Sequence, residues 1–175
     1  MIVFIDETGF SFQALLGSTW APCGRPPLLR RVSAQRRGFS TIIGLTLAGR
    51  IFKQHQRGSI RSPHVLRFLR HVLRHQATPL IVVWDRASIH RAKIVTTFLA
   101  EHPQLDVEWL PKCAPELNPE ELCHGNVKAR IRNLTPKTVT EYRQHVDRGF
   151  ARLRQRPDLL LGFCRHAQLH VNQLW

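Results

Sequence analysis

Several acidic residues stand where they could hold divalent metal ions. Asp6 ends the apolar run MIVFI and Asp85 ends the apolar run PLIVVW, while Glu116, Glu120 and Glu121 follow in the segment APELNPEE. Carboxylates brought together repel one another unless a cation is shared between them, and Mg²⁺ takes oxygen ligands. Two such ions roughly 3.5–4 Å apart activate an oxygen nucleophile and stabilise the leaving oxygen of a phosphodiester. Asp6, Asp85 and a third acid therefore predict metal-dependent phosphodiester chemistry.

The residues alone leave the third acid open. Asn118, Pro119, Glu120 and Glu121 have the pattern of a helix start, with the asparagine as cap and the proline in the first turn. Glu121 then fits the capping-box position, where its carboxylate would bind the backbone. It is therefore either a capping residue or a metal ligand, and Glu116 and Glu120 remain alternatives.

The elements that must position these acids alternate along the chain. Short runs of β-forming residues predict strands, and apolar residues at one-face helical spacing predict helices. A three-strand meander precedes alternating helices and strands, so we expect an α/β fold with a mixed five-stranded sheet and helices on both faces. If the first and fourth strands are parallel neighbours, Asp6 and Asp85 emerge at the same edge. The predicted strands cover residues 1–7, 38–49, 50–58, 79–85 (buried on both faces) and 105–110, and the helices begin near residues 62, 88 and 118.

The charge balance indicates a polyanionic partner. Lys and Arg number 26 against 12 Asp and Glu, which gives a formal net charge of +14, and no acid occurs between residues 8 and 84. A folded, strongly basic domain usually binds nucleic acid. No apolar run approaches the roughly 20 residues of a membrane-spanning helix, and the N-terminus lacks the basic start of a signal peptide. The four cysteines form no disulfide framework, and Cys113, Cys123 and His124 lack the spacing of structural zinc sites.

Four motifs carry a family resemblance. FIDETGF, GRPP, WDRASIH and APELNPEE, in this order between residues 1 and 133, resemble the DDE transposases of the bacterial insertion-sequence branch of the mariner-like superfamily. The resemblance implies an RNase H-like catalytic domain that cuts DNA at transposon ends and joins the 3′-hydroxyl to target DNA with two Mg²⁺ or Mn²⁺ ions. Carried over by motif, the catalytic and metal-binding acids are Asp6, Asp85 and Glu121.

Two departures from the family pattern bear on activity. Arg86 stands where members commonly have asparagine, and its guanidinium could pair with Asp85 or hold a phosphate. Gly125 lowers the helix propensity of the segment after Glu121 by about 1 kcal/mol relative to alanine. Candidate phosphate or DNA contacts are Arg25, Arg30, Arg31, Arg36, Arg37, Arg86, His90 and Lys128.

The resemblance also sets expectations about organisation. We expect a catalytic domain over residues 1–134 and a basic helical tail over residues 135–175 that packs on the core or extends from it, without the helix-turn-helix module that recognises transposon ends. That module would be encoded separately in a split reading frame, or the chain would be a truncated copy. The expected partners are DNA and a second copy of the chain, in the bacterial cytoplasm at the nucleoid. The alternatives are an inactive, DNA-binding remnant and another RNase H-like metal-dependent nuclease.

Overall fold

A mixed five-stranded sheet in the order β3-β2-β1-β4-β5 forms the centre of the protein. The computed structural model describes residues 1–11, 16–29, 38–75 and 79–169. Strands β1, β2 and β3 form an antiparallel meander, and β4 and β5 continue the sheet in parallel with β1. The predicted mixed sheet is thereby confirmed. The strands are β1 (Ile2–Phe10), β2 (Phe39–Thr46), β3 (Ile51–Arg57), β4 (Leu80–Trp84) and β5 (Leu105–Trp109).

The register of β1 against β4 brings the first two acids to one edge. Phe4 pairs with Val83 in parallel, so Asp6 and Asp85 each lie two residues beyond the same pair. In an open α/β sheet the carboxyl ends of parallel strands are where ligands bind. The predicted adjacency of the two aspartates therefore follows from strand order and register.

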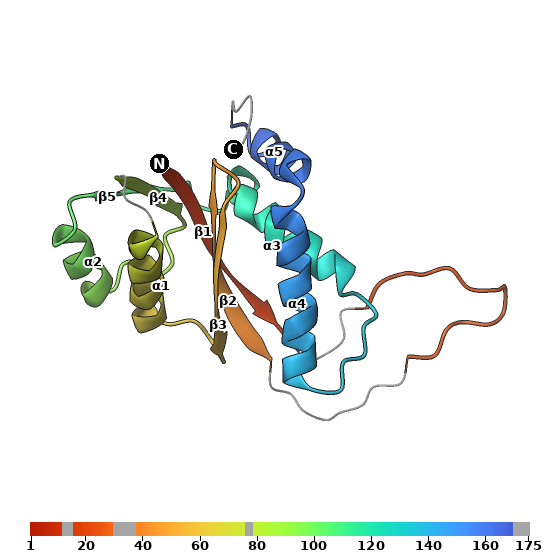
Figure 1. The fold of residues 1–175 in the computed structure, drawn as a ribbon. Helices are drawn as coiled ribbons and strands as arrows, with labels where there is room; N and C mark the ends of the chain where they lie inside the picture. Colours follow the sequence, from red (N-terminus) through yellow and green to blue (C-terminus); the bar gives the residue numbers. More distant parts are fainter. Residues whose placement is uncertain (12–15, 30–37, 76–78, 170–175) are drawn as a thin grey trace.

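Helices cover both faces of the sheet (Figure 1). On one face, α1 (Ser62–Arg74) and α2 (Lys93–Ala100) pack against alternate residues of β1 and β4. On the other, α3 (Pro119–Arg130), α4 (Val139–Arg154) and α5 (Pro157–His166) pack against the opposite side chains of β1, β2 and β3. Each face thus has its own apolar core, and a short 3₁₀ turn, Pro115–Leu117, precedes α3.

Two elements differ from the sequence prediction. Strand β4 is buried on one face only: Leu80, Val82 and Trp84 are buried, whereas Ile81 and Val83 are partly exposed, because α3 packs over β1 and β2 instead. Helix α2 begins at Lys93 and not near residue 88, because residues 88–92 form turns before it.

The C-terminal segment belongs to the second core. Val146 and Phe150 of α4 are fully buried in the same cluster as Ile43 of β2. Helix α4 lies so close to α3 that a Cβ at Gly149 would stand 2.9 Å from a Val127 methyl. The described part of the segment predicted as a basic tail is therefore packed on the sheet.

The described part of the segment between β1 and β2 extends away from the sheet (Figure 1). Trp20 is 99% exposed on it, and Leu28 is 91% exposed. At its base, Gly17 exchanges two hydrogen bonds with the Asn133 side chain, at 2.9 and 3.0 Å. None of the described helices is both long and apolar enough to cross a membrane.

Candidate active site

A cavity of about 140 Å³ opens where β1, β4 and the start of α3 converge. Asp6, Asp85 and Glu121 all line it, so the structure brings together the three acids that the resemblance implied. Their side chains are 17%, 60% and 39% exposed, which leaves the acids open to solvent at the mouth. The other lining residues come from the loop after β5 and the cap of α3: Leu110, Pro111, Cys113, Ala114, Pro115 and Asn118.

The two aspartates are held by short local hydrogen bonds. Asp6 Oδ1 accepts from the Glu7 amide at 2.8 Å, and Asp85 Oδ1 accepts from the Ala87 amide at 2.9 Å. Each carboxylate is therefore oriented by backbone that follows it directly in the chain, which suits a ligand that must meet an ion in a fixed geometry.

The N-terminal cap of α3 positions Glu121 at the cavity. Asn118 Oδ1 accepts from the Glu120 amide at 3.1 Å, while its Nδ2 donates to the Ile5 carbonyl of β1 at 3.4 Å. The capping-box interpretation of Glu121 is wrong, because the Asn118 amide donates to the Pro115 carbonyl instead. Glu121 Oε2 lies 2.8 Å from His124 Nε2. Burial, and then the charge of Asp6, raises the pKa of Glu121.

His90 holds Asp85 rather than facing a phosphate. Only 1% of it is exposed, and its ring stacks on Trp84 with centroids 4.3 Å apart. Nδ1 lies 2.9 Å from Asp85 Oδ1, and Nε2 lies 3.0 Å from Glu7 Oε1. Burial lowers the pKa of His90, but the hydrogen bond and charge of Glu7, together with Asp85, outweigh it and raise the pKa. The expectation of a phosphate contact is corrected, since both ring nitrogens already face carboxylates.

The remaining predicted contacts do not gather at the cavity. Arg25 is exposed on the β1–β2 segment, and Lys128 Nζ stands 5.9 Å from the Phe10 ring centre. Arg86 is exposed, and the ion pairs found among the described residues do not join it to Asp85, so the predicted competition is not seen. Helix α3 runs unbroken through Gly125. The predicted contacts that fall outside the described residues are Arg30, Arg31, Arg36 and Arg37.

Sequence reasoning missed one neighbour of the acids, His124. Its Nε2 lies 3.2 Å from Asp6 Oδ2 and 3.9 Å from Glu120 Oε2, besides its contact with Glu121. Glu120 is fully buried, and within the described part of the chain neither carboxylate oxygen has a hydrogen-bond partner. Burial, and then the charge of Asp6, raises the pKa of Glu120 well above its usual range. The signal was the spacing, since residues three and four positions apart share one helix face.

The donors at this site suit a divalent cation. Carboxylates that crowd one cavity are stabilised when a cation neutralises them, and a buried carboxylate without a partner is costly when charged. Asp6, Asp85 and Glu121 are the carboxylates at this cavity, and His90 and the Ala87 amide orient Asp85.

The sequence matches a known family over most of its length. The family model of the DDE superfamily endonucleases covers residues 1–143. The chain belongs to this family. None of the curated proteins compared with this DDE endonuclease matches it.

Solved structures of similar fold include transposase domains. The Mos1 mariner paired-end complex with Mg shares 15% identity with this DDE endonuclease at a TM-score of 0.70, over 95% of this chain and 53% of the other. The catalytic domain of the Mos1 mariner transposase shares 14% identity at a TM-score of 0.58, over 98% and 84%. The fold is therefore RNase H-like, and the chain spans about half the length of the transposases in those complexes.

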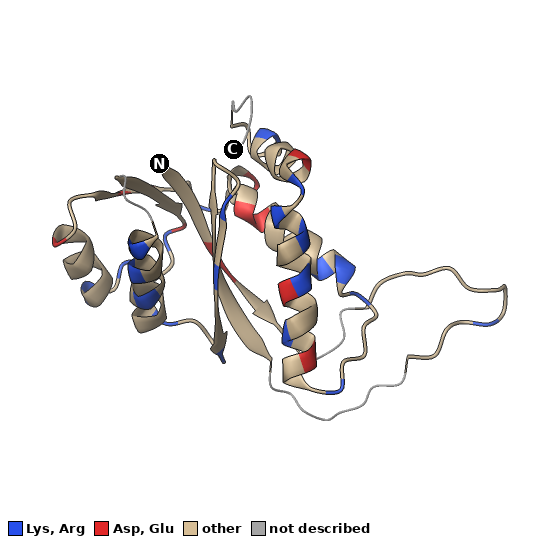
Figure 2. Ribbon diagram, in the orientation of Figure 1, with Lys and Arg blue, Asp and Glu red and all other residues tan. Residues whose placement is uncertain are grey.

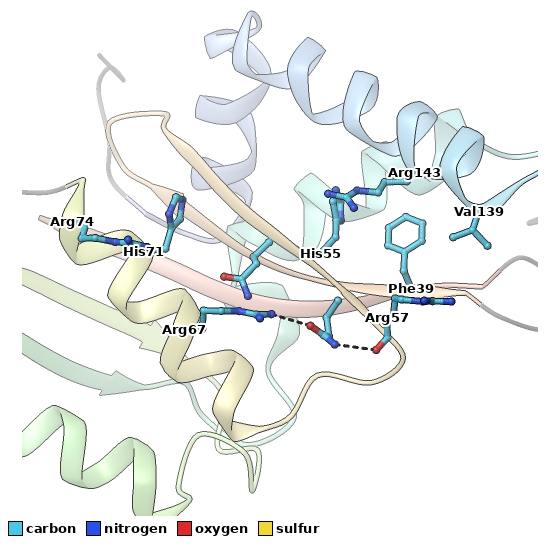
Figure 3. A pocket seen from close by; sticks show the side chains of 10 residues that line it. Phe39, His55, Arg57, Arg67, His71, Arg74, Val139 and Arg143 are labelled. Atoms are coloured by element: carbon cyan, nitrogen blue, oxygen red, sulfur yellow. Dashed lines mark hydrogen bonds between the residues drawn. The ribbon is translucent and has the colours of Figure 1, made fainter.

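A second, basic groove lies at the β3 edge of the sheet. It has a volume of about 540 Å³ between α1, β3 and α4 (Figure 3). Lys and Arg colour much of α1, and α4 carries both basic and acidic positions, while acids also mark β1 and the start of α3 (Figure 2). Arg67 Nη2 donates to Gln56 Oε1 at 2.8 Å, so one guanidinium is held in place. The arginines lining the groove are Arg57, Arg67, Arg74 and Arg143.

One groove residue makes stability depend on pH. Burial, and then the charge of Lys53, lowers the pKa of His55 to about 4 from 6.5, although its Nε2 lies 2.9 Å from Asp147. Burial is the largest cause, and the positive charges of Lys53 and Arg143 lower the pKa further. The unfolded chain binds a proton below pH 6.5 that the folded chain does not bind until about pH 4, so stability falls as the pH decreases through this window.

His55→Gln is expected to remove this loss. Each pH unit of the window corresponds to about 1.4 kcal/mol for one proton, so the variant should lose about 2 kcal/mol less than the parent between pH 7 and pH 5. Urea unfolding at the two pH values measures the difference. His166→Gln, at an exposed position of α5, should behave as the parent does. Equal losses in parent and His55→Gln would contradict the prediction.

Proposed function

We propose that this DDE endonuclease is a transposase catalytic domain that cleaves DNA phosphodiesters at transposon ends and transfers the 3′-hydroxyl into target DNA. The observation that carries the proposal is the convergence of Asp6, Asp85 and Glu121 from three separate elements on one cavity. The three come from β1, the end of β4 and α3, and a packed sheet and helix hold them there. Such an arrangement suits a reaction in which charge builds up on phosphate oxygens.

Two divalent ions, Mg²⁺ or Mn²⁺, are the proposed cofactors, and they would assist deprotonation of the attacking oxygen and stabilise charge on the leaving one. The residues of this chain would act by position. Asp6 and Asp85 present carboxylates oriented by the Glu7 and Ala87 amides, and Glu121 faces them from α3. Solved Mos1 paired-end complexes contain Mg and Mn, which supports the same choice of ions here.

Two reactions would follow in sequence at this site. Water would first attack a phosphodiester and release a 3′-hydroxyl, which would then attack a phosphodiester of target DNA, so each step forms one P–O bond and breaks another. A strand transfer complex is known for Mos1, whose fold this chain shares. Neither step requires a covalent bond between the DNA and a protein side chain, because water and the 3′-hydroxyl are the nucleophiles.

A strand-transfer assay tests the proposal against the two alternatives. The chain is incubated with Mn²⁺, a pre-nicked duplex end with a free 3′-hydroxyl, and supercoiled target plasmid. Joined product is expected from a transposase. Hydrolysis without joining would indicate another RNase H-like nuclease, and binding without either product would indicate an inactive remnant.

The basic groove supports a polyanionic substrate. Its guanidinium groups come from α1, β3 and α4, and Arg67 is already held by a glutamine. Oriented guanidinium groups suit phosphate oxygens, and phosphate contacts fix register without reading sequence. We place part of the DNA backbone here. Three further proposed DNA contacts lie outside the groove: the exposed Arg25 and Arg86, and Lys128 of α3.

Arg67→Gln together with Arg74→Gln is expected to weaken non-specific DNA binding. The slope of log affinity against log salt should fall by about 0.9 for each DNA phosphate that the variant no longer neutralises. Fluorescence anisotropy of a labelled duplex over a salt series measures both quantities. Arg148→Gln with Arg165→Gln removes the same charge from exposed positions outside the groove. If both pairs lower the slope equally, the groove has no special part in binding.

The proposed assembly contains DNA and two copies of the chain. Exposed Trp20 and Leu28 on the extended segment offer apolar surface for a second copy. Light scattering of the chain bound to a duplex end counts the copies, and a single copy per end pair would contradict the dimer.

Because the chain spans about half of the Mos1 chains, choice of transposon ends by a helix-turn-helix portion is proposed for the whole protein, as is action at the bacterial nucleoid. The proposed division places the catalytic domain at residues 1–134 and a C-terminal tail at residues 135–175, whose described part packs on that domain.

A further inference from the structure

A buried carboxylate beside the acidic cavity has no hydrogen-bond partner among the described residues. Glu120 is fully buried at the start of α3, and its nearest cationic group is His124 Nε2, 3.9 Å from Oε2. Buried polar groups are almost always hydrogen-bonded, and a buried charge is paired or bound to a metal. An orphaned carboxylate in a well-packed helix therefore points to a ligand.

The groups around Glu120 have metal-ligand chemistry. The donor atoms of Asp6, Glu120 and His124 all lie within 4.8 Å of one another. His124 Nε2 is 3.2 Å from Asp6 Oδ2 and 3.9 Å from Glu120 Oε2. The separations of 3.2 and 3.9 Å are compatible with donors about 2.0–2.2 Å from one shared ion, because such donors stand at most twice that distance apart.

The three donors come from a rigid frame. Glu120 and His124 lie one helical turn apart on α3, and Asp6 stands on the central strand β1 that α3 packs against. Asn118 ties the start of α3 to the Ile5 carbonyl, one residue before Asp6. The spacing between helix and strand is therefore set by the fold, as a metal site requires.

We propose that Asp6, Glu120 and His124 bind a divalent first-row transition-metal ion. Imidazole suits transition metals, whereas Mg²⁺ is bound through oxygen ligands. Replacing an all-carboxylate set by two carboxylates and one imidazole therefore selects against Mg²⁺. This inference adds a second metal site to the proposed function. It rests on that function only because Asp6 is also one of the candidate catalytic acids.

Titration with Co²⁺ tests the site without any measurement of cleavage. The visible absorption bands of Co²⁺ depend on its ligands, so binding to the parent chain should shift these bands from those of Co²⁺ in water. An excess of Mg²⁺ should leave the shifted bands in place. Glu120→Gln is nearly isosteric, and His124→Gln removes the nitrogen donor. Loss of a residue that only orients a metal ligand costs about 10–100-fold in metal affinity, so each variant should weaken Co²⁺ binding by at least about 10-fold.

Two control variants separate this site from its neighbours. Glu116→Gln, at an exposed acid of the preceding turn, should bind Co²⁺ as the parent does. Asp85→Asn should also keep the Co²⁺ bands, even where it abolishes cleavage, because Asp85 is not among the three ligands. The proposed function can thus fail while this site stands, and the reverse.

The results that would overturn the site are distinct. If Glu120→Gln and His124→Gln both bind Co²⁺ with the parent's affinity and spectrum, the three residues do not form it. If Mg²⁺ competes for the site with the same affinity as Co²⁺, the imidazole gives no selectivity and the proposed transition-metal site is wrong. Circular dichroism of each variant tests whether it is folded. If His124→Gln does not fold, the Co²⁺ affinity of Glu120→Gln alone decides whether the site exists.

Discussion

Asp85→Asn is expected to abolish metal-dependent DNA cleavage while the protein stays folded. Asparagine keeps the oxygen that accepts from the Ala87 amide, so the local turn is preserved and only the charge is lost. A metal ion contributes several kcal/mol of charge stabilisation in the transition state, and about 4 kcal/mol corresponds to roughly 10³ in rate. Nicking of supercoiled plasmid in Mn²⁺, followed as initial rates, measures the loss.

Asp106→Asn provides the matched control. Asp106 is an exposed aspartate on the edge strand β5, outside the cavity, so its replacement removes the same charge without touching the site. Its rate should equal the parent's. If Asp85→Asn nicked DNA as fast as the parent, the activity would not come from this cavity and the assignment of Asp6, Asp85 and Glu121 would be wrong.

Phe150→Ala is expected to have the largest effect on stability. Phe150 is fully buried between α4 and the sheet, in the cluster that contains Ile43 and Leu45 of β2. Truncation of a buried phenylalanine to alanine costs about 3–5 kcal/mol, because transfer energy is lost and a cavity remains. Urea unfolding at pH 7 measures this loss, which should appear as a lower midpoint at an unchanged slope.

This prediction also tests how the C-terminal segment relates to the rest of the chain. Ile94→Ala, at a position of α2 that is 45% exposed, should change stability by less than about 1 kcal/mol. If Phe150→Ala unfolded with two separate transitions, or cost no more than Ile94→Ala, then α4 would be an appended tail and not part of the sheet's core.

The candidate site shows which features the sequence can predict. The aspartates were found because each ends an apolar run. Their adjacency was predicted only on the condition that the first and fourth strands are parallel neighbours, and the sheet order meets this condition. The third acid could not be chosen from the residues alone. Glu120 and Glu121 are adjacent in sequence, and only the docking of α3 on β1 turns one toward the cavity and buries the other.

His90 and His124 show a different limit. Their positions in sequence suggested a phosphate contact for one and no role for the other. In the structure each lies against carboxylates from distant segments, since His90 meets Glu7 and His124 meets Asp6. Contacts across 83 and 118 residues depend on how whole elements pack, which local patterns do not encode.

The sequence by itself determined the basic charge, the order of strands and helices, the motifs that place the chain among DDE endonucleases, and the two aspartates at strand ends. Those features are local, because period, capping and composition are read within a few residues. The tertiary structure decided that the last acid of the motif faces the cavity, that Glu120 is buried beside His124 with no hydrogen bond from the described residues, and that the C-terminal helices complete a core. These outcomes depend on the packing of α3 and α4 onto the sheet, where side chains distant in sequence meet.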